Sequence, residues 1–207
     1  MSAWHWISGL SYNKNDLLIS FEGYLKTTAE ITRYFKGTDV IGQGFYSGDA
    51  RSYGIDFYMK KEYKKNVAWI SYTLSKTEEH LSYNAPGDYQ PAPQDQRHEL
   101  KLVGIYNLKS FYFSANYVYG SGFAIMKNFS TGNNAVPSYS RFDASVIYKF
   151  NWKKIPGNVG LSVLNVFNHS NIKYSDLRRI EAGTNKQLNV HTEAIPFTPT
   201  LFLKFRI

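Results

Sequence analysis

The chain has 207 residues, with 24 Lys and Arg against 16 Asp and Glu, a formal net charge of +8 and no cysteine. The absence of cysteine excludes disulfides, thiolate metal sites and cysteine nucleophiles, and no run of about 18 apolar residues is present to form a spanning helix. Aromatic residues make up 17% of the chain although its mean hydropathy is only −0.39, which suits a wall with one apolar and one wet face.

The predicted elements are strands in which apolar and polar residues alternate. In the segment 52–60, Tyr53, Ile55, Phe57 and Met59 alternate with more polar neighbours. Because side chains alternate between the two faces of a strand, one face of each strand is apolar and the other is polar. The pattern recurs along the chain, and in order it predicts nine principal strands at 3–12, 16–26, 51–63, 67–78, 97–108, 111–119, 139–150, 159–167 and 197–207.

Short polar turns alternate with long connections between these strands. Turns are expected at 13–15, 64–66 and 109–110, and a slightly longer connection at 151–158 carries Pro156 and Gly157. The long connections, rich in Gly or Pro, cover about 27–50, 80–96, 121–138 and 169–195, the last with a further hairpin of strands 174–182 and 187–194. Alternation of short turns and long loops is typical of the wall of an outer-membrane β-barrel. The face of the strand at 159–167 stays open, because both of its registers are apolar.

Candidate chemistry is sparse. The five histidines have no ligand spacing, and the trio Ser138, Asp143 and His169 lacks the context of a nucleophile elbow. We therefore expect no catalytic, cofactor-binding or metal-binding residues and no cofactor. The basic residues are scattered, many of them in turns, which disfavours nucleic acid as a partner.

Three further sets of residues have expected positions. Charged residues of the polar faces are expected to line a wet lumen, where opposite charges pair across neighbouring strands: Glu22, Asp56, Lys60, Glu99, Lys101, Arg141, Asp143 and Lys204. Aromatic residues near strand ends are expected at the two lipid interfaces: Trp4, Trp6, Tyr12, Tyr63, Tyr106, Tyr119 and Trp152. Aromatic residues of the long loops are candidates for ligand contact at the outer mouth: Tyr34, Phe35, Phe45, Tyr46, Tyr83 and Tyr89.

Several segments, taken together in their order and spacing, carry a family resemblance. They are SYGIDF at 52–57, WISYTLSKT at 69–77, DQRHEL at 95–100, LNVFN at 164–168 and PFTP at 196–199. The chain resembles the C-terminal barrel strands of TonB-dependent outer-membrane receptors, of the type found in Bacteroidetes. The resemblance implies a barrel of about 22 strands around an N-terminal plug, on which the TonB complex of the inner membrane pulls to admit a bound ligand. The transported ligand and the residues that contact it are not specified by the sequence.

The resemblance also defines what we expect of the chain as a whole. Residues 1–207 are expected to be the C-terminal part of a receptor barrel, a partial all-β, antiparallel up-and-down wall without the plug and early strands. Residues 1–6 do not show a basic segment followed by an apolar one, so we expect no export signal within this chain. The expected location is the bacterial outer membrane, and the expected partners are membrane lipid, the rest of the receptor, the TonB complex through the plug, and the barrel-assembly machinery. Family members usually end on an aromatic residue, whereas this chain ends on Ile207 with Phe205 on the same face.

Three alternatives remain open at this point. One is a complete small barrel that acts as a passive pore or adhesion protein, which requires an even number of strands. The second is a soluble β-sandwich that binds carbohydrate through exposed Trp and Tyr side chains. An outer-membrane lipase that uses Ser138 is a more remote alternative.

Overall fold

The structure is a computed structural model, and it describes residues 1–35, 44–82, 87–123, 137–179 and 187–206. The described chain is built from twelve β-strands, which are, in order, β1 (Ser2–Lys14), β2 (Leu17–Phe35), β3 (Gly44–Tyr63), β4 (Asn66–Leu81), β5 (Gln90–Pro91), β6 (His98–Leu108), β7 (Phe111–Gly120), β8 (Tyr139–Trp152), β9 (Ile155–Leu164), β10 (Ile172–Arg179), β11 (Gln187–Glu193) and β12 (Thr198–Phe205). Within these residues, no helix is long and apolar enough to span a membrane.

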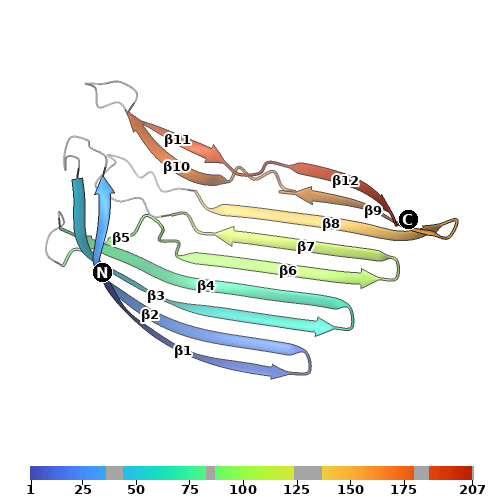
Figure 1. Cartoon of the computed structure of the whole chain (residues 1–207), viewed down its shortest axis with the longest axis horizontal. Coiled ribbons are helices and arrows are strands. Elements are labelled where there is room, and N and C mark those ends of the chain that lie inside the picture. Colours follow the sequence, from blue (N-terminus) through green and yellow to red (C-terminus); the bar gives the residue numbers. More distant parts are fainter. Residues whose placement is uncertain (36–43, 83–86, 124–136, 180–186, 207) are drawn as a thin grey trace.

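Nine long strands pair in chain order in one antiparallel sheet, as Figure 1 shows. The order is β1-β2-β3-β4-β6-β7-β8-β9-β12, and the two-residue strand β5 adds to β4. The hairpin β10–β11 forms a separate two-stranded sheet between β9 and β12 in the chain. The prediction of nine principal strands in an up-and-down meander is therefore confirmed.

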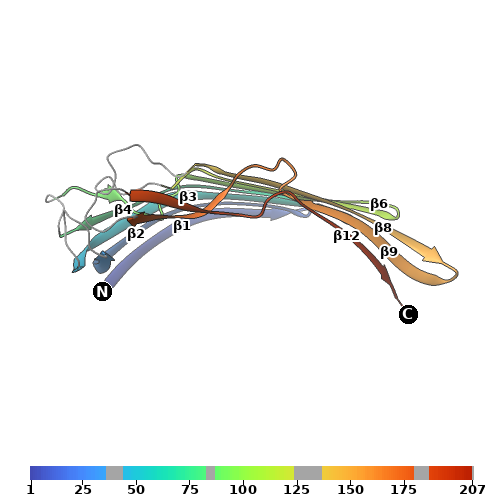
Figure 2. The ribbon, with the colours of Figure 1, turned by 90° about the horizontal axis from the view of Figure 1, so that it is seen from above.

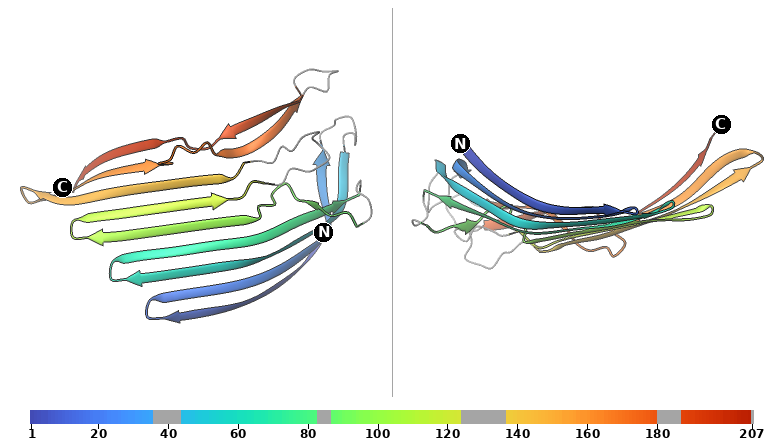
Figure 3. Two further views of the ribbon diagram at one scale, coloured as in Figure 1. Left: turned by 180° about the vertical axis from the view of Figure 1, so that it is seen from behind. Right: turned by 90° about the horizontal axis from the view of Figure 1, so that it is seen from below.

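The sheet is a single curved layer (Figure 2), and the view from behind shows the same meander (Figure 3). At the two ends of this nine-strand order, β1 and β12 each have a paired neighbour on one side only among the described residues. The layer is thus an open barrel wall and does not close into a barrel by itself. A β-sandwich has two sheets packed face to face, and this single layer lacks that architecture.

The strand register sorts side chains onto two faces, which we name by their composition. Residues of the apolar face pair across seven strands in the row Tyr12, Ile19, Met59, Ile70, Leu102, Tyr117 and Phe142. The neighbouring row on the polar face is Ser11, Ser20, Tyr58, Ser71, Lys101, Val118 and Arg141. A polar face and an apolar face on one closed sheet let strands separate lipid from water.

The short turns all lie at one end of the sheet, which we call the turn end, and the long connections lie at the opposite loop end (Figure 1). Left-handed residues close the turns, including Asn15 at φ 51°, Lys64 at φ 55° and Lys109 at φ 54°. The turn after β8 is shorter than predicted, because Lys153 and Lys154 both adopt positive φ. The connection expected at 151–158 is therefore wrong: Pro156 lies in β9.

Strands β2 and β3 extend much further toward the loop end than predicted. Residues 27–35 and 44–50, expected as loop, continue the β2–β3 ladder beyond an irregularity between Thr28 and Ile31. The irregularity includes Glu30 at φ 60°, and Figure 1 shows the ends of both strands turning away from the sheet. Strands of 19 and 20 residues exceed the roughly 10 that a membrane requires, so this hairpin reaches past the membrane-spanning length.

The connection between β4 and β6 is partly paired with the sheet, although its prolines predicted a loop. Strand β5 pairs with Glu78 and Glu79 of β4, and the Asp95 carboxylate accepts a hydrogen bond of 2.6 Å from the backbone N–H of Thr77. Ala92, one of the fully buried residues, packs beside this ladder. The prolines are tolerated because β5 lies at the sheet margin and pairs over only two residues.

Candidate functional site

The charged residues of the polar face form ion pairs mainly along single strands. Lys101 Nζ lies 2.6 Å from Glu99 Oε1, and Arg141 Nη2 lies 2.9 Å from Asp143 Oδ2, each pair two residues apart. Lys60 pairs in the same way with Glu62. The expectation that these charges share one face is confirmed, but pairing across strands is wrong for these three pairs. Residues i and i+2 of a strand lie on the same face and are already neighbours.

A cavity of about 420 Å³ lies on the polar face at the loop end of β6, β7 and β8. Its polar lining includes Glu99, Tyr139 and Arg141, and its apolar lining includes Phe123, Ile172 and Ile195, among others. The Arg141 guanidinium is held in place because it donates to Asp143 at 3.1 Å and to the Tyr139 hydroxyl at 3.2 Å. A carboxylate, a guanidinium, a phenol and apolar walls together fit a solute with both polar and apolar parts.

Asn165 holds one residue of the cavity wall, Ile195, in place. Its side chain is almost fully buried, and its Nδ2 donates to the carbonyl oxygens of His169 and Ile195 at 2.9 and 3.0 Å. Its backbone N–H donates to Asp143 Oδ1 at 2.9 Å. Asn165 therefore links the end of β9 to β8 through Asp143 and to the segment before β12 through Ile195. Asn165 has φ 50°, so β9 ends at Leu164, and the predicted strand to Phe167 is wrong at its last residues.

Asn171 links the residues just before β10 to the start of β8. The backbone N–H of Ser140 donates to Asn171 Oδ1 at 2.7 Å, and Asn171 Nδ2 donates back to the carbonyl oxygen of Ser140 at 2.8 Å. These two buried asparagines were missed in the sequence, where only the LNVFN segment at 164–168 marked this place. For Asn165, the available signal was an asparagine between two hydrophobic residues of an apolar segment, because asparagine adopts positive φ more readily than most residues.

A smaller cavity of about 310 Å³ lies on the polar face of β1, β2 and β3. It contains both signs of charge, since Glu22, Lys26 and Asp56 line it together with His5 and Tyr24. Asp56 accepts a hydrogen bond of 2.5 Å from Thr73 on the neighbouring strand. Fewer apolar side chains line this cavity than the one beside Arg141.

The aromatic residues predicted near strand ends lie on the apolar face in two groups. The first group, Trp4, Trp6 and Tyr119, lies toward the loop end, and the second, Tyr12, Tyr63, Tyr106 and Trp152, lies toward the turn end. Trp4 and Trp6 are 71% and 68% exposed in the isolated sheet. Two groups separated along the strands match the positions of interfacial aromatic belts.

The aromatic residues predicted to contact a ligand are only partly assembled. Tyr34 and Phe45 form a ring contact at 5.0 Å on the β2–β3 hairpin. The centroid of the Tyr89 ring lies 4.1 Å from the Arg51 guanidinium carbon. Tyr89 is therefore engaged in a contact with β3. Tyr83 lies outside the described residues.

The trio Ser138, Asp143 and His169 is not brought together as a triad. Asp143 binds Arg141 and the Asn165 backbone, and His169 Nδ1 lies 3.1 Å from Asn171 Oδ1. In the described part of the chain, no three His, Cys, Asp or Glu side chains form a group that could hold a metal ion.

Comparison with solved structures finds a similar fold in a known transporter. The unliganded ferric citrate transporter FecA matches with a TM-score of 0.64 and 15% sequence identity, over 98% of this chain and 30% of that chain. At this identity the likeness concerns the fold alone. The chain thus spans 30% of the length of that structure. The comparison with curated proteins finds no match.

Comparison with family models gives a match over most of the chain. Residues 3–168 match the family described as TonB dependent receptor-like, beta-barrel. The match covers β1 to β9, the strands that have one apolar and one polar face and are joined alternately by short turns and long connections. The chain therefore belongs to the TonB-dependent receptor-like β-barrel family.

Proposed function

We propose that residues 1–207 are the C-terminal part of the barrel of an outer-membrane receptor that imports a nutrient with energy delivered by the TonB complex. The observation that carries the proposal is the family match over strands with one apolar and one polar face. In this role the apolar face contacts lipid, and the polar face lines a lumen filled by a plug from another part of the receptor. The chain itself performs no bond-breaking chemistry.

The orientation follows from the lengths of the connections. In outer-membrane barrels the short turns lie in the periplasm and the longer loops lie outside the cell, so the loop end of this sheet faces outward. The cavity beside Arg141 then opens near the outer mouth, where its mixed lining can contact an arriving nutrient. Metal chelates, vitamins and glycans all combine polar and apolar surface and remain candidate classes.

Uptake by cells that produce the full receptor tests the proposal. Growth is measured on limiting ferric citrate, cobalamin or maltopentaose, in strains with and without a functional TonB protein. We expect the receptor to support growth on at least one of the three nutrients only when TonB is present. Equal growth without TonB would indicate a passive pore instead.

Protease accessibility of intact cells tests the orientation separately. We expect cleavage within the long connections, including 121–138, and protection of the turn at Lys64 and Lys65. Cleavage at the short turns, with the long connections intact, would contradict the orientation.

A further inference from the structure

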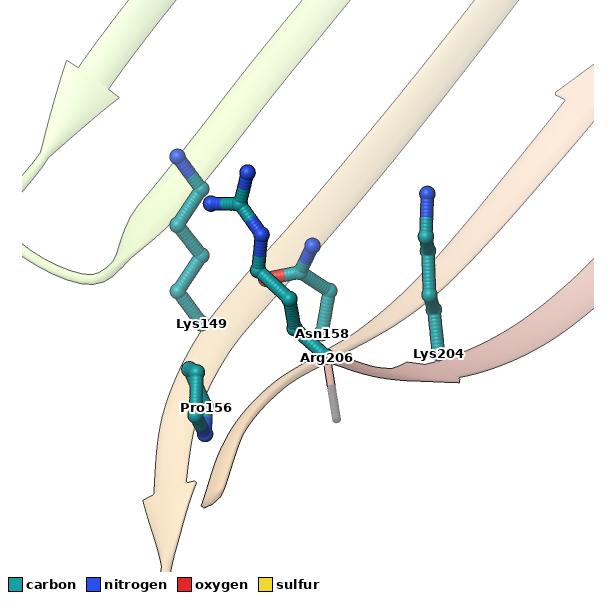
Figure 4. Close-up of a pocket in the computed structure, with 5 residues that line it drawn as sticks. All are labelled: Lys149, Pro156, Asn158, Lys204 and Arg206. Carbon is teal, nitrogen blue, oxygen red and sulfur yellow. The ribbon is translucent and has the colours of Figure 1, made fainter. Parts of the chain in front are cut away.

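Three cations gather on the polar face at the turn end of the last three long strands. Lys149 of β8, Lys204 of β12 and Arg206 just after β12 line a cavity of about 360 Å³ together with Asn158 and Pro156. Figure 4 shows the long side chains of Lys149, Lys204 and Arg206 extending from the sheet toward the same side. This cluster, which we call the basic pocket, lies at the opposite end of the sheet from the cavity beside Arg141.

The register explains why these cations meet. Lys149 pairs with Asn158, and Asn158 pairs with Lys204, so the three residues form one row across β8, β9 and β12. The backbone N–H of Arg206 donates to the carbonyl oxygen of Pro156 at 2.9 Å, which places Arg206 in the next row on the same face. Neighbouring strands lie about 4.8 Å apart, so the backbones of Lys149 and Lys204 lie about 10 Å from each other. The short side chain of Asn158 lies between them.

The basic pocket differs from the rest of the polar face in its lack of carboxylates. Elsewhere on this face, Arg33, Lys60, Lys101 and Arg141 each pair with an Asp or Glu. Among the described residues, no ion pair is formed by Lys149, Lys204 or Arg206, and no carboxylate lines their cavity. Lys149 Nζ instead lies 3.8 Å from the centroid of the Tyr112 ring.

Like charges held together repel one another, and an anion between them removes that cost. We propose that the basic pocket binds a carboxylate side chain from the segment that fills the lumen of the receptor, outside residues 1–207. The proposal rests on the proposed function, which supplies such a segment. A carboxylate above Asn158 accepts from Lys204 on one side and, when Lys149 turns from the Tyr112 ring on β7 toward β9, from Lys149 on the other, with the Asn158 amide as a third donor. Arg206 adds a guanidinium at the rim.

The position favours a carboxylate that comes from the lumen over one that comes from a strand beside β12. A strand paired with the free edge of β12 brings its side chains next to Lys204 and Arg206. Lys149 lies two strands further in, beyond the reach of such a neighbour. Only a segment that lies across the polar face contacts all three cations.

Zero-length cross-linking of the full receptor in detergent tests the proposal. A carbodiimide activates a carboxylate, which then forms an amide with a lysine amine in contact and loses one water. We expect peptides that join both Lys149 and Lys204 to Asp or Glu in the receptor segment that precedes residue 1. The pair Glu99 and Lys101, with its nitrogen and oxygen 2.6 Å apart, is the internal positive control.

Variants assign the links. Lys149→Gln is expected to remove its own link and to keep that of Lys204, and Lys204→Gln to do the reverse. Formation of the Glu99–Lys101 link shows that the reaction worked. If it forms, the proposal is overturned by any of three results: Lys149 and Lys204 give no link, they give links only within residues 1–207, or Lys204 alone is linked. A receptor that imports nutrient in a TonB-dependent way but gives this result would overturn only the basic pocket, not the proposed function.

Inorganic phosphate distinguishes a protein carboxylate from a free anion. The thermal unfolding temperature of the full receptor is measured at phosphate concentrations from the order of micromolar to the order of millimolar, at constant ionic strength. We expect the same small response in the native receptor and in the variant K149Q/K204Q/R206Q, because the pocket is already occupied. A phosphate-dependent rise in the native receptor only would show that the pocket is open to free anions, and it would overturn the proposal.

Discussion

Glu78 and Glu79 are consecutive in β4, and their carboxylates pair with arginines on opposite faces of the sheet. Glu78 Oε2 lies 2.8 Å from Arg51 Nη2 on the apolar face, and Glu79 Oε2 accepts from Arg33 Nε at 3.0 Å on the polar face. Both carboxylates are nearly buried, with side chains 6% and 4% exposed. At the loop end, the Glu78 pair therefore links β4 to β3 on one face, and the Glu79 pair links β4 to the extended part of β2 on the other face.

Removing the charge of Glu78 should weaken the link between β4 and β3. Glu78→Gln leaves Arg51 and Lys76 without their shared carboxylate, and we expect the free energy of unfolding to fall by about 1 to 3 kcal/mol. Because the Arg51 side chain is 43% exposed, water limits the loss. Urea unfolding of the full receptor in detergent measures it. The control Glu22→Gln, at an exposed carboxylate, should change stability by less than about 0.5 kcal/mol.

Asn165 should be sensitive both to its side chain and to its backbone. Asn165→Ala removes the hydrogen bonds to His169 and Ile195 and places alanine at a positive φ, which together should cost about 2 to 4 kcal/mol. Asn165→Gly keeps the backbone freedom and should recover about 1 kcal/mol of that loss. Unfolding in urea compares the two variants with Asn13→Ala at an exposed site. Equal stability of all three would contradict the buried network.

Two glycines offer a matched test of close packing between strands. A Cβ at Gly48 would overlap the carbonyl oxygen of His80 and lie 2.8 Å from the Leu81 Cα, whereas a Cβ at Gly104 would meet nothing within 4 Å. Gly48→Ala should therefore destabilise the receptor by about 1 to 3 kcal/mol, because the backbone of the neighbouring strand β4 must move to make room. Gly104→Ala should be neutral or stabilising by up to about 1 kcal/mol. The reverse order in thermal unfolding would refute the register at β3 and β4.

The assignment of the two faces is tested by adjacent residues of β4. Ile70 lies in the apolar row and Ser71 in the polar row. Ile70→Arg places a charge toward lipid and should cost about 2 to 4 kcal/mol, while Ser71→Arg faces the lumen and should cost much less. The amount of folded receptor in outer-membrane fractions, scored by heat-modifiable migration, measures both. A larger loss for Ser71→Arg would invert the faces.

The two faces and the turns could be predicted from the sequence because their causes are local. A period of two places Tyr53 and Ile55 together regardless of what the neighbouring strands do. Asn15 and Asp16 are residue types that tolerate the positive φ of a turn. The same-strand pairs Glu99–Lys101 and Arg141–Asp143 follow from this period as well. Their spacing of two residues is the signal that points to pairing along the strand.

Strand ends could not be predicted because they depend on partners distant in sequence. Residues 44–50 contain two glycines and resemble a loop, but the extended β2 supplies their hydrogen bonds. Asn165 ends a strand in an apolar segment, where it bonds to Asp143 of the neighbouring strand and to the carbonyl oxygens of His169 and Ile195. In both places a partner that is remote in the sequence outweighs the local preference of the chain.

The odd number of strands in the sheet determines how it can be completed. Eight antiparallel steps lead from β1 to β12, so both strands run from the loop end to the turn end. Joined edge to edge, β1 and β12 would be parallel, and the alternation of up and down strands would fail at that seam. A continuous antiparallel barrel that includes these nine strands must therefore contribute an odd number of others between β12 and β1, beginning and ending with a strand that runs toward the loop end.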